Sequence, residues 1–408
     1  MKKKYLITSS IASALIFGAS SALAAVDSAA EKVELRQSCT VSGATLDNCF
    51  TNFQTLASWM SSTRRPNETI PLHVNIGPGT FLGTPNPDIN IICNPTNGYT
   101  GYTTFQGSGN NQTTLKGTGS GSTASINIQN CTELGFSDIK IATNFYGGIY
   151  WKGGGNSRWT NIDIDTIARA WAEPTCGAKR GNHYWLNSKL NSTAAFSLGT
   201  TYQASCDESW FFGSEVTVTA PDGGTPTNGA AVAADGSGII HLYGSVLRAL
   251  IDGPISSSSS LSAAAVGPLF SSDTRVGGEI HIHGTGIDVI SETGQDAVVF
   301  SAAGNGMIHA DASAYNMSTT GNKTRIKNNG GMVKAPYQWV QNNQPPQVIS
   351  ENGADMFVET NCDANACHDV DTGTETHLLI YNESCDFSNH GPWFDIVTRK
   401  CRGDMSTI

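Results

Sequence analysis

The stretch EIHIHGTGIDVI, residues 279–290, decides the fold, because isoleucine alternates with polar side chains before and after a glycine pair. Alternation with a period of two is typical of a β-strand that has one apolar face and one polar face. Gly284 and Gly286 lie where the chain would turn. The stretch therefore predicts two short strands joined by a tight corner, with His281 and His283 on the polar face of the first strand.

The same unit returns along the chain at intervals of 23 to 31 residues, with one interval of 40. The aligned apolar residues are Ile139, Ile162, Leu190, Val216, Leu247, Ile287 and Tyr315. A single strand cannot bury one face alone, so repeats of this length predict stacked parallel β-coils that cover one another. A β-sandwich is the alternative, with Asn-Gly pairs at 97–98, 228–229 and 352–353 as hairpin turns, but sandwich strands lack such a longer period.

The composition agrees with an all-β chain and narrows the partners. Of 408 residues, 44 are glycine and only 14% are charged, which is typical of strands and turns rather than helices. Acidic residues outnumber basic ones by 34 to 24, and the formal net charge is -10. This excess of negative charge argues against nucleic acid and anionic membranes as partners. Beyond the N-terminus no apolar stretch is long enough to predict a membrane span.

Four regions are expected. Residues 1–24 resemble a secretory signal peptide, with three lysines, an apolar run and Ala22-Leu23-Ala24 as the cleavage site. Residues 25–70 form an N-terminal segment whose apolar residues follow helical spacing and predict a capping helix, namely Leu46, Cys49, Phe50, Phe53, Leu56 and Met60. Residues 71–335 form the β-helix, with Ser256–Ser260 and Ala263–Ala265 in a long polar loop. After Pro345-Pro346 interrupts the pattern, residues 336–408 complete a cysteine-containing C-terminal cap.

Ten cysteines in an exported chain predict disulfides rather than metal thiolates. Their order suggests local pairs, although other connectivities stay open: Cys39 with Cys49, Cys93 with Cys131, Cys176 with Cys206, Cys362 with Cys367, and Cys385 with Cys401. Covalent haem attachment expects two residues between the cysteines, and Cys362 and Cys367 are separated by four. No cofactor is required by the sequence.

Two motifs and the coils resemble one known fold family. VNIGPGTF at 74–81 and FQGSGNNQTTLKG at 105–117 are similar to the first coils of the pectin-lyase-like superfamily, and in particular to pectinesterases. The resemblance covers approximately residues 45–335. It implies a single-stranded right-handed parallel β-helix, export to the periplasm or beyond, and a polysaccharide partner such as pectin or another acidic glycan.

The catalytic motif of that family is degenerate here. Pectinesterases use two aspartates and an arginine, but CDESWFFGSEV at 206–216 places Ser209 at the position of one aspartate. Asp207 and Glu208 come just before it and are catalytic candidates only if the strand parity shifts. The related galacturonan hydrolases use an Arg-x-Lys strand, which Arg325 and Lys327 resemble. These two are substrate-binding candidates, or else an ordinary basic strand end.

Aligning three coils produces a grid of polar residues on one outer face. One ladder holds His241, His281 and His309, and the next holds Tyr243, His283 and Asp311. Neighbouring coils lie about 4.8 Å apart. We hypothesise a divalent metal site at His281, His283 and His309, or an acid–base pair of His283 and Asp311 beside Tyr243. The alternative is a polar ladder without turnover.

Aromatic residues gather in the middle coils. Trp151, Trp185 and Trp210 are candidates for stacking on sugar rings, and equally for layers of the core. The sequence thus predicts an exported β-helix protein that binds or processes a polysaccharide, by an esterase, lyase or hydrolase reaction if it is an enzyme. The alternative is a non-catalytic binding or structural protein on the same scaffold. The oligomeric state is left open.

Overall fold

The computed structural model describes residues 30–41, 44–45, 47–62, 70–82, 89–93, 102–117, 124–143, 147–175, 180–193, 199–224, 229–253, 261–267, 277–291, 297–304, 306–311, 314–318, 323–329, 331–336, 348–351, 355–359, 370–372, 377–381, 393–395 and 400–401. The expected signal peptide lies outside these residues, as do Cys176, Cys362, Cys367 and Cys385.

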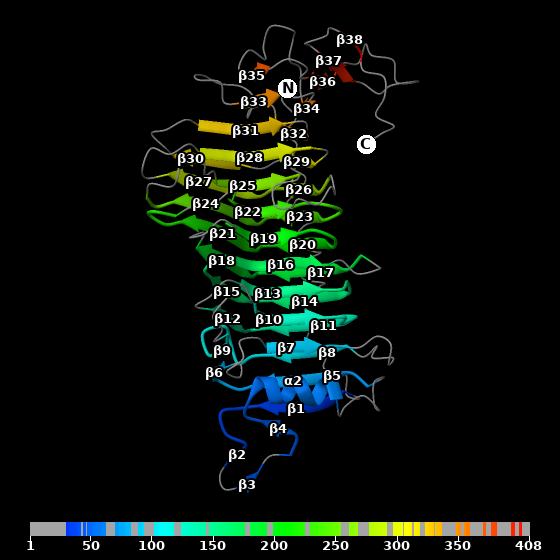
Figure 1. The fold of residues 1–408 in the computed structure, drawn as a ribbon, viewed down its shortest axis with the longest axis vertical. Coiled ribbons are helices and arrows are strands. Elements are labelled where there is room, and N and C mark those ends of the chain that lie inside the picture. Colours follow the sequence, from blue (N-terminus) through cyan, green and yellow to red (C-terminus); the bar gives the residue numbers. More distant parts are fainter. Residues whose placement is uncertain are drawn as a thin grey trace, which may run out of the picture.

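The chain winds through three long sheets, to which successive coils contribute strands in a fixed order (Figure 1). Sheet A has sixteen strands, in spatial order β4 (Cys49–Phe50), β1 (Glu31–Leu35), β5 (Leu72–Ile76), β8 (Thr103–Gln106), β11 (Glu133–Ser137), β14 (Asn156–Thr160), β17 (Asn182–Leu186), β20 (Glu208–Phe212), β23 (Ile239–Tyr243), β26 (Glu279–His283), β29 (Met307–Asp311), β32 (Met332–Pro336), β34 (Asp355–Glu359), β36 (His377–Tyr381), β37 (Trp393–Asp395) and β38 (Lys400–Cys401).

Sheet C has nine strands, namely β6 (Gly79–Leu82), β9 (Thr113–Gly117), β12 (Lys140–Thr143), β15 (Asp163–Thr166), β18 (Lys189–Thr193), β21 (Glu215–Ala220), β24 (Val246–Ile251), β27 (Gly286–Ser291) and β30 (Ala314–Ser318). Sheet D has eleven, namely β7 (Ile89–Ile92), β10 (Ala124–Gln129), β13 (Gly147–Lys152), β16 (Arg169–Thr175), β19 (Thr200–Ala204), β22 (Gly229–Ala234), β25 (Leu261–Val266), β28 (Ala297–Ala303), β31 (Lys323–Asn329), β33 (Val348–Glu351) and β35 (Val370–Thr372).

Strand pairing between coils is parallel, which confirms the predicted parallel β-helix and excludes the sandwich. In the described part of the chain, antiparallel pairs occur only between β2 (Thr40–Val41) and β3 (Ala44–Thr45), and in the C-terminal series β36, β37 and β38. A right-handed coil is the sense that parallel crossovers adopt in about 98% of cases. Because each coil passes through all three sheets in turn, the inward faces of the sheets enclose one interior.

In six successive coils, a corner of two residues joins the sheet A strand to the following sheet C strand, from β11–β12 to β26–β27. The corner residues have φ between 49° and 58°, namely Asp138, Asn161, Asn187, Gly213, Gly244 and Gly284. Only glycine, asparagine and aspartate enter this left-handed region readily, so these residue types fix the corners. The next residue is a buried hydroxyl in four coils, and the backbone N–H of Ser188 donates to Ser214 Oγ at 3.1 Å.

The interior is a stack of large side chains. Along sheet A, the rings of Phe105, Phe136, Trp159, Trp185 and Phe211 stack in sequence, with centroids 4.4 to 5.9 Å apart. Aliphatic residues continue this row in later coils. Stacked identical positions give the coils a continuous apolar core.

One step of the predicted coil alignment was wrong by two residues. Leu190 pairs with Ile164 rather than with Ile162, whereas the other aligned pairs agree with the strand registers. A slip of two residues keeps every side chain on its own face, so alternation alone cannot detect it.

The N-terminal helix is shorter than its apolar spacing indicated. Helix α2 (Phe53–Ser62) buries Phe53, Leu56 and Met60 against the core. Cys49 and Phe50 instead form strand β4, which pairs with β1. A two-residue strand satisfies its backbone groups against the sheet, and this overrides the helical spacing of its side chains. Leu46 lies outside the described residues.

The sheets also extend beyond the expected limits of the β-helix. Sheet A starts at β1, and sheets A and D continue through β32 to β36. Residues Ala263–Ala265, expected in a polar loop, belong to β25, which is buried at every position. Small side chains let both faces of this strand be covered closely. In the described part of the chain, no helix is long and apolar enough to cross a membrane.

Two predicted disulfides are confirmed. Cys39 bonds to Cys49, and Cys93 bonds to Cys131 across 38 residues. Cys206 is also disulfide-bonded, while Cys176, the partner predicted for it, lies outside the described residues.

Candidate functional site

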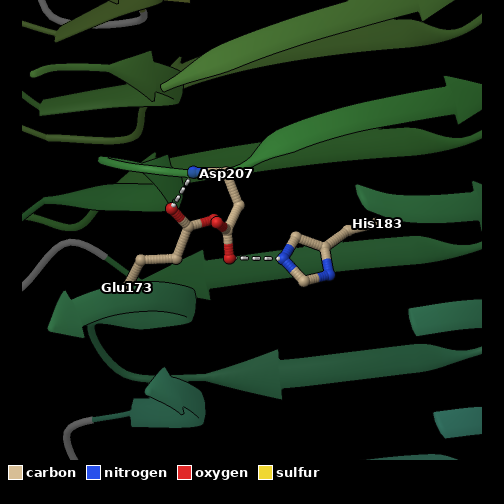
Figure 2. A group of neighbouring side chains, drawn as sticks. All are labelled: Glu173, His183 and Asp207. Carbon is tan, nitrogen blue, oxygen red and sulfur yellow. Dashed lines mark hydrogen bonds and ion pairs between the residues drawn. The ribbon is translucent and has the colours of Figure 1, made fainter. Parts of the chain in front are cut away.

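The interior of the middle coils contains a cluster of ionisable groups, shown in Figure 2. Glu173 lies on β16, His183 on β17, and Asp207 immediately precedes β20. His183 Nε2 lies 3.1 Å from Asp207 Oδ2, and the two side chains are 0% and 2% exposed. Glu173, His183 and Asp207 have ligand atoms that all lie within 4.8 Å of one another.

Every polar group of His183 has a partner. A carboxylate can only accept, so Nε2–H donates to Asp207, and Nδ1 then accepts from Ser157 Oγ at 2.7 Å. Ser157 Oγ accepts in turn from Trp159 Nε1 at 2.6 Å. The imidazole edge also contacts Trp151 and Trp171, both with centroids 4.8 Å away. The ring is therefore locked in one orientation.

Glu173 is held by donors from the next coil. Its Oε2 accepts three backbone N–H groups, from Ser205, Cys206 and Asp207, at 2.9 to 3.0 Å, and Oε1 accepts Trp171 Nε1 at 3.1 Å. Burial raises the pKa of Glu173, while the neighbouring His183 and the backbone N–H donors oppose that rise. Glu173 thus fastens the start of β20 to β16.

The contacts Ser157–His183–Asp207 follow the order of a hydrolytic triad, but the arrangement is sealed. All three residues are buried inside the coil stack, and Ser157 Oγ already has two partners. A nucleophile must reach its substrate. This corrects the catalytic role considered for Asp207, because its side chain faces the interior and cannot reach a ligand. The cluster is structural.

The outer face of sheet A contains the predicted polar grid. Strand pairing places His241 beside His281 and His281 beside His309, and the same registers place His283 between Tyr243 and Asp311. The Asp311 side chain is not among the described ones, so its acid–base role stays a prediction. Toward the N-terminus, the ladder of His241 continues through Trp210 and Tyr184, and the ladder of Tyr243 continues through Phe212.

Rings in these ladders contact one another from coil to coil. The centroids of His241 and His281 are 4.8 Å apart with planes tilted by 14°, and those of Tyr243 and His283 are 4.9 Å apart with a 15° tilt. His309 lies 5.9 Å from His281 and 6.1 Å from His283, with tilts of 61° and 65°. Face-to-face stacking along the ladder turns ring edges, and so the ring nitrogens, toward the sides.

Two of the imidazoles pair with carboxylates on the same face. His241 Nε2 lies 2.8 Å from Glu208 Oε1, and His281 Nε2 lies 3.2 Å from Glu279 Oε2. Burial lowers the pKa of His241, and the neighbouring His281 lowers it further, while the hydrogen bond to Glu208 raises it. Glu208 is thus an outward, half-buried acid, unlike Asp207.

The expected metal ligands do not form a ready coordination sphere. Within the described residues, three His, Cys, Asp or Glu ligand atoms lie within 4.8 Å of one another at Glu173, His183 and Asp207, and not in the histidine grid. His281, His283 and His309 are neighbours in the strand register, but one nitrogen from each ring does not lie within that distance of the other two.

The aromatic candidates separate into two groups. Trp151 and Trp185 are 1% and 0% exposed, so they are core layers, the second of the two roles predicted for them, and they do not contact sugar. Trp210 faces outward and is half-buried, with the rings of Tyr184 and His241 5.4 and 4.6 Å away. Parity separates them, because inward and outward positions alternate along each strand.

Arg325 and Lys327 lie on β31 of sheet D, away from the grid on sheet A. Their side chains are not among the described ones, and a role in substrate binding stays a prediction.

Sequence reasoning missed Glu173 and His183. A signal was present for His183, because it shares the parity of buried Trp185 in the stretch NHYWL, and a polar residue at an inward position needs a partner.

The fold and the outer face of sheet A define a parallel β-helix protein with two adjacent ladders of rings. No family model and no curated protein sequence matches the chain. Among solved structures, the chain is similar to a mutant pectin methylesterase crystallised with a hexasaccharide, at 11% identity and a TM-score of 0.41, covering 63% of this chain and 78% of the other. The three parallel sheets give this chain the architecture of a parallel β-helix. Similarity at this level carries no information about activity.

Proposed function

We propose that this chain is an exported β-helix protein that binds a polysaccharide along the outer face of sheet A. The observation that carries the proposal is the continuous ladder of rings Tyr184, Trp210, His241, His281 and His309, beside a second row of Phe212, Tyr243 and His283. An extended glycan needs an extended, flat surface with aromatic and polar groups.

The exposure of these rings supports binding rather than packing. Tyr243 is 40% exposed, among the most exposed large apolar residues of the described chain. Its neighbours Phe212 and His283 hold it on both sides, at 5.4 and 4.9 Å, so that its orientation is fixed before a ligand arrives. A preorganised ring loses little entropy on binding.

Processing of the glycan is the second candidate, and the pair His241–Glu208 favours it. A half-buried imidazole with a lowered pKa, oriented by a carboxylate, has the properties of a general base. Asp207 is excluded from this role by its position inside the core.

Export is part of the proposal. The disulfides Cys39–Cys49 and Cys93–Cys131 fit an oxidising compartment. N-terminal sequencing of the protein from periplasmic and culture fractions tests the predicted cleavage after Ala24.

A glycan array followed by titration calorimetry tests binding. We expect Trp210→Ala and Tyr243→Ala each to weaken binding about tenfold, because each removes an aromatic side chain from the ladder that would contact the glycan. Leu82→Ala on sheet C and Ile92→Ala on sheet D are matched controls, since these side chains are 48% and 43% exposed on other faces. If the controls weaken binding equally, or no glycan binds, the proposal fails. Analysis of products distinguishes processing from binding, and loss of product with His241→Ala would support the second candidate.

A further inference from the structure

A cluster of imidazoles lies at the C-terminal end of the ring ladder. His281 and His283 lie two residues apart on β26, and His309 lies on the adjacent β29. The ring of His309 is nearly equidistant from the other two, at 5.9 and 6.1 Å, and is steeply tilted to both. With Zn–N bonds of about 2.1 Å, two imidazoles on one ion have ring centres roughly 5 to 6 Å apart.

The carboxylate of Glu279 orients one imidazole of this cluster, that of His281. Glu279 Oε2 lies 3.2 Å from His281 Nε2, and a carboxylate that accepts there fixes the proton on Nε2. The lone pair of the neutral ring is then on Nδ1. This carboxylate–imidazole pair is the arrangement that commonly orients histidine ligands of zinc.

We propose that His281, His283 and His309 bind one divalent transition-metal ion, such as zinc, on the outer face of β26 and β29. The site lies within the proposed glycan-binding ladders, and its test with zinc does not depend on whether a glycan binds. Its nitrogens are not yet within one coordination sphere, so binding requires rotation of the imidazoles, and His281 is 19% exposed and so has one open side. Lys334 follows His309 in the ladder, and its positive charge lowers the affinity.

Calorimetry with zinc chloride tests the site on untagged protein that has been stripped with EDTA and dialysed. We expect one zinc ion per chain with micromolar affinity. His309→Phe keeps a flat ring in the ladder but removes the nitrogens, and we expect it to weaken zinc binding at least tenfold. Cobalt substitution gives a second readout, because its visible absorption band should vanish in the same variant.

His241→Phe is the matched control, because His241 stacks on His281 but lies outside the trio. We expect its zinc affinity to stay within twofold of the parent. Asp207→Asn tests the buried cluster as a competing site, and we expect it to retain zinc. If His309→Phe proves unfolded by circular dichroism, His309→Gln replaces it. Absence of saturable zinc binding, equal losses in His241→Phe and His309→Phe, or loss confined to Asp207→Asn would each overturn the proposal.

Discussion

His183 Nε2 lies 3.1 Å from Asp207 Oδ2 in the interior of the coil stack, where the two side chains are 0% and 2% exposed. The pair joins β17 to the residue before β20, and Glu173 binds three backbone N–H groups at the same point. The interior at this point is therefore polar. Such a cluster stabilises only when each group has its partner.

Asp207→Ala removes the partner of the His183 Nε2–H and of the Gly181 backbone N–H. Because two buried donors are then left alone, we expect a loss of about 3 to 5 kcal/mol in the free energy of unfolding. Urea unfolding followed by tryptophan fluorescence measures it. Asp165→Ala is the control, since that carboxylate is 46% exposed and pairs with Lys140, and it should cost no more than about 1 kcal/mol. Equal losses in both variants would show that the buried pair is not special.

Glu173 makes the free energy of unfolding depend on pH, and the direction of its pKa shift sets the direction of that dependence. Burial raises its pKa above the ordinary value of 4.5, so the folded state binds the proton more tightly than the unfolded state does. The contribution of Glu173 is then fully present below pH 4.5 and is lost as pH rises through the folded pKa. We expect the stability difference between the parent and Glu173→Gln to fall with rising pH above 4.5. Urea midpoints of both proteins across this range measure it, and a difference that rises with pH contradicts the assignment.

Much of the fold could be predicted from the sequence. The burial of one face makes apolar and polar residues alternate within each strand, and this pattern returns once per coil. The alignment of His241, His281 and His309 was correct for this reason. The predicted alignment of Ile162 with Leu190 was wrong by two residues, because the position of the corner, rather than the alternation, sets the register of these two strands.

The interior cluster was not predictable in the same way. Asp207 was a catalytic candidate only if the strand parity shifted, and the alternation of β20 does not extend to the residue before the strand. Its direction is set by Gly181 and His183 in the preceding coil, and such contacts cannot be read from one strand. Trp151 and Trp185 show the converse case, in which residue type suggests a ligand surface and parity places the ring in the core.

Trp159 is the centre of the stacked interior. Its ring lies 4.4 Å from Phe136 and 4.9 Å from Trp185, and its Nε1 donates to Ser157 Oγ. Trp159→Ala leaves a cavity that rigid coils cannot close, and we expect a loss of about 3 to 5 kcal/mol. Trp159→Phe keeps the stack and should lose less than half as much. Thermal and urea unfolding measure both, and similar losses in the two variants would mean that the hydrogen bond to Ser157, rather than the volume, dominates.

Substitutions of Asn187 test the importance of the corner between the sheet A strand and the sheet C strand of a coil. Its φ is 49°, and the equivalent corners of the next coils are glycines with φ of 57° and 54°. Asn187→Val forces a β-branched residue into the left-handed region, and we expect a loss of about 1 to 2 kcal/mol. Asn187→Gly meets no such strain, because glycine enters this region without a Cβ clash, and its stability should stay close to that of the parent. Urea unfolding of both variants separates backbone strain from loss of the asparagine side chain. If the glycine variant loses as much stability as the valine variant, the side chain and not the corner geometry holds this coil in place.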